Sequence, residues 1–442
     1  MELLDMPPEI FQRVVKTYVR TNGVVEAWKI RKTCKTFRDY VEYEIFSTPK
    51  LNGYIKEKAG RNILRNNIAK FLYLRSNKLN GFIRDLVPNF IRDVMAIAEP
   101  WVRDDKAKAA LRKVLCELYV KTDSNAFACI VRDIRHGRHQ NHLQGFQVTK
   151  VINLVTAAAA AGSPDWLRDL ANHDHQVLWL HSPTFGYPIV AAAYAGQFNV
   201  VKALAEQALT DQGLSTTTSA TAKHTSFREA ICTSIKVGHD EMATVLIQKY
   251  GEAFGPASET CMTEWLQCSV STGNKVITRL LQRIPTHAGT YTFYTAFENS
   301  CRLRDPGLIR IFFEEGRLEV NGISSYSYPL TVASQMSHTS TVPVEVLLSL
   351  GANPDGPTYR GHFRRPLEVA LQTGRDRVAI LLLEAGANIH LISKSCWKPY
   401  MKQWSGMEEV TEALNRSLRE SQKPRPLCGE LFVCGNTGGD EQ

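Results

Sequence analysis

The stretch of sequence that decides the fold is 365–388, which reads RPLEVALQTGRDRVAILLLEAGAN. Pro366 suits the first turn of a helix, because its missing N–H would have no intrahelical partner there. Gly374 and Gly386 can each adopt the left-handed backbone conformation that ends a helix. Between these glycines runs an apolar stripe at helical spacing, formed by Val378, Leu382 and Leu383. The stretch therefore predicts two short antiparallel helices, which can bury that stripe only against copies of themselves.

Ala370 belongs to the part of this pattern that repeats most clearly upstream. Its small side chain lets a neighbouring helix approach closely. The same order of proline, apolar residue, two variable positions and alanine returns at 188–192 and at 329–333. Weaker copies keep the spaced apolar positions at 157–170, 238–247, 273–281 and 296–316, the last with Arg304 in the place of Gly374. Three strong copies in one register are not expected by chance, so the sequence predicts a repeat array over 148–395.

The copy at 365–388 resembles an ankyrin repeat. The pattern of that family runs Thr-Pro-Leu-His-x-Ala, then Gly, then spaced Val and Leu-Leu, and then Gly-Ala-Asn or Gly-Ala-Asp. The resemblance implies an all-α protein built on an ankyrin-type helical solenoid of about seven repeats. It also implies that the concave face of the solenoid binds a protein partner.

Residues 3–47 carry a second pattern, in which apolar residues recur at intervals of three and four. Pro7 and Pro8 precede a first predicted helix, and two more follow after breaks near 22–23 and near Phe37. The opening Leu-Leu-Asp-Met-Pro-Pro-Glu-Ile and the later Cys-Lys-Thr-Phe resemble the F-box, a domain that docks on the Skp-type adaptor of cullin-RING ubiquitin ligases. The resemblance implies an adaptor-binding set made of Leu4, Pro7, Ile10, Cys34 and Phe37.

The match to the F-box departs from the family pattern at three places. Met6-Pro7-Pro8-Glu9 stands where the family usually has Leu-Pro, Thr33 stands where Val is usual, and Phe37 stands where Trp is commoner. A small helical bundle that caps the array is therefore the alternative interpretation. An F-box followed by helices and ankyrin repeats also resembles an arrangement common among fungal proteins.

The predicted helices divide the chain into consecutive parts. We expect an F-box-like domain over 1–49, a helical connector over 50–147, the repeat array over 148–395, a capping helix over 396–422 and a flexible tail over 423–442. The capping helix would cover the exposed end of the array, as the terminal units of solenoids must. The tail, rich in Gly and polar residues, has the composition of a frayed terminus.

The basic charge of the chain belongs to its amino-terminal third. The 442 residues carry a net charge of +9, and residues 1–150 hold 28 Lys and Arg against 16 Asp and Glu. The remaining residues hold 25 against 28. Basic residues in this third lie in helical surroundings without interleaved aromatic residues, which favours a solvated surface over nucleic-acid binding.

The cysteines and the amino terminus indicate the compartment. Ten cysteines are scattered without a Cys-x-x-Cys pair, which is typical of neither a disulfide framework nor a zinc site. The start, Met-Glu-Leu-Leu-Asp-Met, lacks the basic and apolar regions of a secretory signal. No apolar stretch approaches the ~20 residues that a membrane-spanning helix needs. We therefore expect a cytoplasmic or nuclear protein with reduced thiols and no membrane contact.

A search for catalytic motifs finds none. The chain has no phosphate-binding Gly-x-x-x-x-Gly-Lys-Ser/Thr loop, no His-Glu-x-x-His zinc helix and no Gly-x-Ser-x-Gly nucleophile elbow. Histidines at 136, 139 and 142 lack nearby cysteines or carboxylates, so a polar loop is favoured over a metal site. We expect neither enzymatic activity nor a cofactor or metal.

Aromatic and arginine residues lead into several of the repeats. Such residues are enriched in binding hot spots. The predicted partner-binding set is Phe185, Tyr187, Tyr291, Phe293, Tyr326, Tyr328, Tyr359, Phe363, Arg364 and Arg365. The competing interpretation is that about half of the rings pack over the helix starts. The functional hypothesis is a recognition protein, which resembles a substrate-recognition subunit of a ubiquitin ligase; the alternative is a scaffold or effector without that link.

Overall fold

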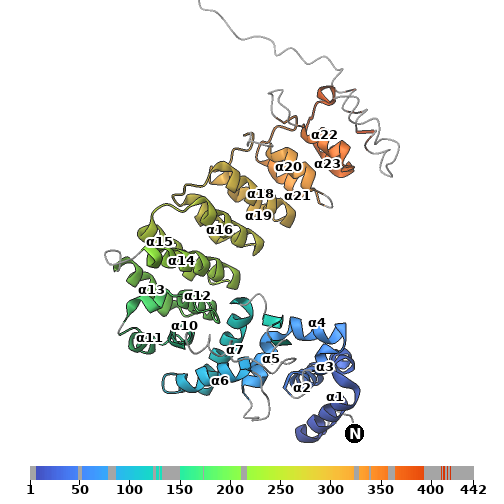
Figure 1. Cartoon of the computed structure of the whole chain (residues 1–442). Helices are drawn as coiled ribbons and strands as arrows, with labels where there is room; N and C mark the ends of the chain where they lie inside the picture. Colours follow the sequence, from blue (N-terminus) through green and yellow to red (C-terminus); the bar gives the residue numbers. More distant parts are fainter. Residues whose placement is uncertain are drawn as a thin grey trace, which may run out of the picture. The chain divides into compact units, whose positions relative to one another are not determined.

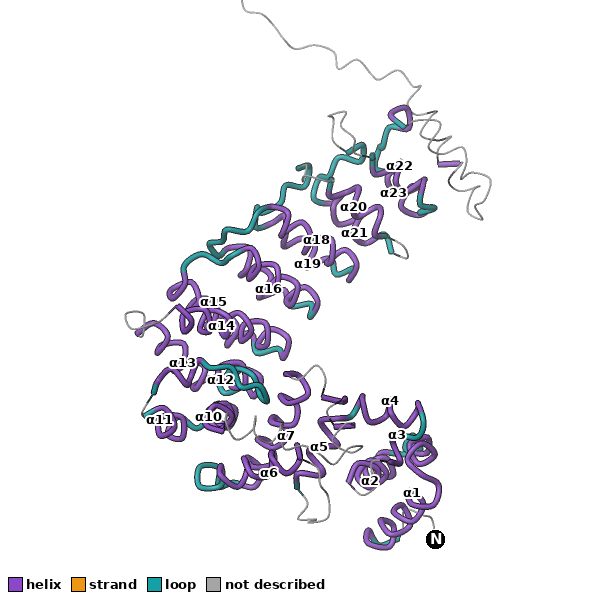
Figure 2. Tube along the Cα trace, in the orientation of Figure 1, coloured by secondary structure: helices purple, strands orange, loops and turns teal. Residues whose placement is uncertain are grey.

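A computed structural model describes the chain over 6–47, 52–77, 86–122, 126–128, 130–131, 150–172, 174–210, 217–322, 328–337, 340–356 and 364–392, with isolated positions between 410 and 419. In these ranges the protein is all-helical, as predicted, and extended pairing is limited to two isolated bridges (Figure 2). The predicted tail and most of the predicted capping helix lie outside the described residues. The described residues divide into two compact units, one within 1–268 and 284–287 and the other within 269–283 and 288–442.

The first unit begins with a group of helices that surrounds an aromatic core. These helices are α1 (Pro8–Ile30), α2 (Lys35–Ser47), α3 (Asn52–Ile55), α4 (Lys58–Asn66), α5 (Ile68–Ser76), α6 (Leu86–Ala98) and α7 (Asp105–Thr122). Phe46 stacks on Tyr54, which meets Phe71 edge-on. Arg75 joins this core by donating to the carbonyl of Phe46 at 3.2 Å, while its guanidinium lies over the Phe71 ring. α2 contacts α5, and α5 contacts α7, so the amino-terminal helices continue into the connector.

Two breaks interrupt the helices of this amino-terminal group. Gly23 has a φ of 82° and divides α1 into two helical segments, which confirms the predicted break near 22–23. The second break was predicted near Phe37, and that position is wrong. Phe37 lies inside α2, which begins two residues earlier at Lys35, because the Cys34 sulfur accepts the N–H of Phe37 at 3.3 Å.

Helix pairs follow in the first unit at the positions of the predicted copies (Figure 1). They are α10 (Lys150–Ala161) with α11 (Pro164–Ala171), α12 (Pro188–Ala195) with α13 (Phe198–Thr210), and α14 (Thr217–Val237) with α15 (Asp240–Phe254), followed by α16 (Glu259–Ser271). The first helices α10, α12 and α14 contact one another in that order, and α13 contacts α15. Each pair therefore buries its apolar faces against the next pair.

The second unit repeats this arrangement. It holds α17 (Lys275–Arg283), α18 (Thr290–Leu303) with α19 (Pro306–Glu314), α20 (Pro329–Met336) with α21 (Val342–Ser349), and α22 (Pro366–Gln372) with α23 (Asp376–Glu384). α18, α20 and α22 contact one another in order, as do α17, α19 and α21. Figure 1 shows the pairs α20–α21 and α22–α23 side by side.

The packing explains the residue pattern of the copies. Pro188, Pro329 and Pro366 each begin a first helix, and the alanines four positions later are fully buried. Gly196 ends α12 in the left-handed conformation, with a φ of 76°. Arg304 ends α18 in the same conformation, with a φ of 59°, although it carries a side chain. The predicted marker position of the degenerate copy is therefore confirmed by its backbone.

Candidate interaction surfaces

An exposed apolar stripe runs along the start of α1. Pro7 is exposed, Ile10 retains 45% of its accessible surface and Val14 retains 41%. These positions lie three and four residues apart, so they share one face of the helix. Residues on the other face, Phe11, Val15 and Val19, are buried. The chain thus leaves an aliphatic face without a partner among the described residues, which is the property expected of a docking surface.

The remaining residues of the predicted adaptor-binding set lie behind this stripe or outside the described chain. Phe37 meets Phe11 edge-on, with 5.7 Å between ring centroids, and is half-buried. Cys34 is half-buried as well and holds the start of α2 through its sulfur. Both residues support the helices behind the stripe. Leu4 lies outside the described residues.

The structure corrects the predicted partner-binding surface at three rings. Phe185 is fully buried and stacks on Phe90 of α6. Phe293 is buried in α18 beneath the guanidinium of Arg317. Tyr328 is buried too, and its hydroxyl accepts the backbone N–H of Asn353 at 3.1 Å. These side chains cannot reach a partner, because neighbouring helices and loops cover them.

Other members of that set keep exposed surface. Tyr291 at the start of α18 retains 57% of its accessible surface. Arg364 is exposed, and Arg365 donates to the carbonyl of Asp355 at 2.8 Å. Tyr187 is half-buried and meets the His181 ring edge-on. The positions that lie outside the described residues are Tyr326, Tyr359 and Phe363.

Sequence reasoning missed that the connector lies on the first helices of the array. The Tyr194 hydroxyl of α12 donates to Glu117 of α7 at 3.1 Å. Lys121 of α7 lies 4.7 Å from the centroid of the Tyr194 ring and donates to Thr233 of α14 at 3.4 Å. Burial lowers the pKa of Lys121, and the nearby charge of Lys236 lowers it further. α7 also contacts α10, so it touches the first helices of three consecutive pairs. No periodicity in the sequence reveals such a contact.

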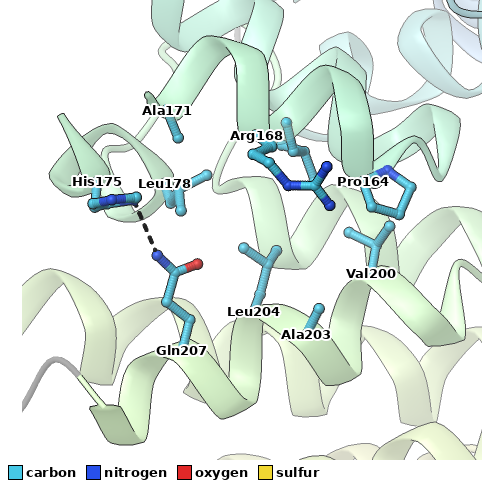
Figure 3. Close-up of a pocket in the computed structure, with 10 residues that line it drawn as sticks. Pro164, Arg168, Ala171, His175, Leu178, Val200, Ala203, Leu204 and Gln207 are labelled. Atoms are coloured by element: carbon cyan, nitrogen blue, oxygen red, sulfur yellow. Dashed lines mark hydrogen bonds between the residues drawn. The ribbon is translucent and has the colours of Figure 1, made fainter. Parts of the chain in front are cut away.

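A pocket of about 200 Å³ lies between α11 and α13 (Figure 3). Its lining includes Arg168, Leu178 and Leu204, and His175 faces Gln207 across a hydrogen bond of 3.3 Å between their side-chain nitrogens. Pockets that hold small-molecule ligands usually measure about 300–1,000 Å³. This one is smaller and open to solvent through exposed residues such as His175, so its chemistry does not indicate a ligand site.

One cluster has the residue types of a nucleophilic site without the access that such a site needs. His224 Nε2 lies 2.8 Å from the Tyr250 hydroxyl, which lies 3.5 Å from the Cys261 sulfur. Cys261 is fully buried, and Tyr250 is buried against Trp265. Burial lowers the pKa of His224, with Arg228 adding to the effect. The cluster joins α14, α15 and α16 and cannot admit a substrate to the sulfur.

Over the described part of the chain, no group of three or more His, Cys, Asp or Glu side chains is placed to hold a metal ion. None of the described helices combines the length and the apolar character that crossing a bilayer requires. Neither the protein-family models nor the curated proteins that were compared with the chain match it.

Proposed function

We propose that the protein is a non-enzymatic recognition subunit, in which ankyrin-type repeats bind a protein partner and the F-box-like helices bind the Skp-type adaptor of a cullin-RING ubiquitin ligase. The observation that carries this proposal is the exposed stripe of Pro7, Ile10 and Val14. It lies at the apolar opening on which the F-box resemblance depends. A cytoplasmic or nuclear location is part of the same proposal.

The repeat half of the proposal is supported by the helix pairs. Their prolines, buried alanines and left-handed helix ends fall at the positions that the ankyrin pattern assigns. Arrays of this kind offer an extended surface made of loops and first helices. The exposed candidates on that surface are Tyr291 and Arg364 in the second unit.

Co-purification of the full chain with a Skp-type adaptor tests the ligase link. Replacing both Ile10 and Val14 with Lys should abolish binding, because two charges would be placed in the docking face. Val276→Lys is the matched control. Val276 in α17 is more exposed than Ile10 or Val14, at 65%, and lies far from them along the chain. Adaptor binding that survives the double substitution would contradict the proposal, provided that circular dichroism shows an intact fold.

A second candidate function is a scaffold whose amino-terminal helices only cap the array. It is favoured by the contacts that run from α2 through α5 and α7 to α10, which make these helices continuous with the repeats. Under this alternative the wild-type protein would show no adaptor binding. The Ile10→Lys and Val14→Lys changes would then have no effect on any interaction of the protein.

A further inference from the structure

α14 and α16 lie side by side in a defined register within the first unit. The indole N–H of Trp265 donates to the carbonyl of Arg228 at 3.3 Å. The Arg228 side chain pairs with Glu264, with 3.3 Å between Nε and Oε2. Cys232 follows Arg228 by one helical turn, and Cys268 follows Glu264 by one turn, so the register brings both cysteines to the same contact.

Both cysteines are free thiols, and Cys232 is placed to donate a hydrogen bond to the Cys268 sulfur. Cys232 retains 9% of its accessible surface and Cys268 retains 6%, whereas the nearby Cys261 retains none. A small oxidant can therefore reach this pair more readily than it can reach Cys261.

The hydrogen bond from Cys232, with a nearby lysine, makes one of the two sulfurs nucleophilic. The hydrogen bond from Cys232 and the charge of Lys236, which also donates to the sulfur, lower the pKa of Cys268 to about 7. Burial and Glu264 act in the opposite direction. Lys121 of α7 is a second cation close to both thiols. The lowered pKa favours the thiolate form of Cys268, which is the form that reacts with oxidants.

We propose that Cys232 and Cys268 form a peroxide-sensitive thiol pair, a reversible modification site that links α14 to α16 covalently. The Cys268 thiolate attacks one oxygen of hydrogen peroxide. An S–O bond forms, the O–O bond breaks and hydroxide leaves to the solvent, which leaves Cys268 as a sulfenic acid. Cys232 then loses its proton and attacks the Cys268 sulfur, so that the S–S bond forms, the S–O bond breaks and water leaves.

The pair differs from the other described cysteines in having both a partner sulfur and a cation. Cys116 and Cys301 are buried, and burial raises the pKa of each thiol above its ordinary value. Cys34 is the more accessible, but its sulfur is engaged at the start of α2. Oxidation at low peroxide concentration should therefore select Cys268 among these residues and end in the bond to Cys232.

Peptide mapping of the full-length protein tests the proposal. The protein is treated with hydrogen peroxide, blocked with N-ethylmaleimide and digested without reduction. A peptide linked through Cys232 and Cys268 should form and should disappear after treatment with dithiothreitol. Cys232→Ser should leave Cys268 as a sulfenic acid that dimedone traps, and Cys261→Ser should leave the linkage unchanged. If both cysteines stay fully alkylated at a peroxide concentration that oxidises Cys34, the proposal is overturned.

A second variant keeps the test independent of the cysteine substitutions. Lys236→Met removes the exposed cation beside Cys268 and should slow formation of the linked peptide severalfold at pH 7. Lys202→Met removes an exposed lysine of α13 and should leave the rate unchanged. Equal rates for the wild type and Lys236→Met would overturn the activating role given to the lysine.

Discussion

The carboxylate of Asp355 accepts the backbone N–H of Asn388, one copy further along the chain, at 2.6 Å. Asn321 makes the equivalent contact. Its side-chain oxygen accepts the backbone N–H of Asn353 at 2.8 Å. In both cases the donor is the asparagine of a Gly-Ala-Asn sequence. These hydrogen bonds join the loops of consecutive copies.

Asp355→Ala should destabilise the second unit. The substitution removes a charge-assisted hydrogen bond, but Asn388 is exposed and water can replace the acceptor, so the loss should be about 1 kcal/mol. Urea unfolding monitored by circular dichroism measures it. Asp165→Ala is the control, because its pair with Arg168 is highly exposed and should contribute less than about 0.5 kcal/mol. Equal effects of the two changes would refute the role given to the loop contact.

Ala370→Leu should overpack the contact between α22 and its neighbours. Ala370 is fully buried, so the added atoms must displace packed side chains at a cost of about 1–3 kcal/mol. Ala385→Leu makes the same change at an exposed position after α23 and should alter stability little. Thermal unfolding separates the two. A fully stable Ala370→Leu protein would show that the register assigned to this copy is wrong.

Tyr291 is exposed and Tyr328 is buried, so replacing each of them with Ala should have different effects on stability and on partner capture. Tyr328→Ala should lower stability by about 3–5 kcal/mol, because it removes a buried ring together with its hydrogen bond to Asn353. Tyr291→Ala should change stability by less than about 0.5 kcal/mol and weaken capture of a protein partner. If the double variant Tyr291→Ala with Arg364→Ala captures the partner as well as the wild type does, this face is not part of the proposed surface.

The first unit should lose stability in mild acid through His224. Its pKa in the folded protein lies below the ordinary value of 6.5, because burial and Arg228 disfavour the charged ring. The unfolded chain therefore binds a proton at this residue more readily, and stability falls as the pH drops through 6.5. His224→Phe should flatten that part of the pH profile measured by urea unfolding.

The sequence by itself determined the helices and their pairing, because those features depend on local rules. Each residue that marks a copy shapes only the backbone and packing within a few positions of it. These residues are the proline at position 366, the small Ala370 and a residue near each helix end that can adopt the left-handed conformation. The same rules located Arg304 at the end of α18 and the break at Gly23. They misplaced the start of α2, because the capping role of the Cys34 sulfur is not a common helix-start signal.

Only the tertiary structure decided which side chains face a partner. Phe185 and Tyr291 look alike in sequence, since both are aromatic and precede or begin a first helix. Their exposure differs because α6 covers the first, whereas the second retains 57% of its accessible surface. The crossing of α7 over Tyr194 and the contact of Cys232 with Cys268 also join residues far apart in the chain. Such contacts depend on how whole helices stack, and no short sequence pattern encodes that stacking.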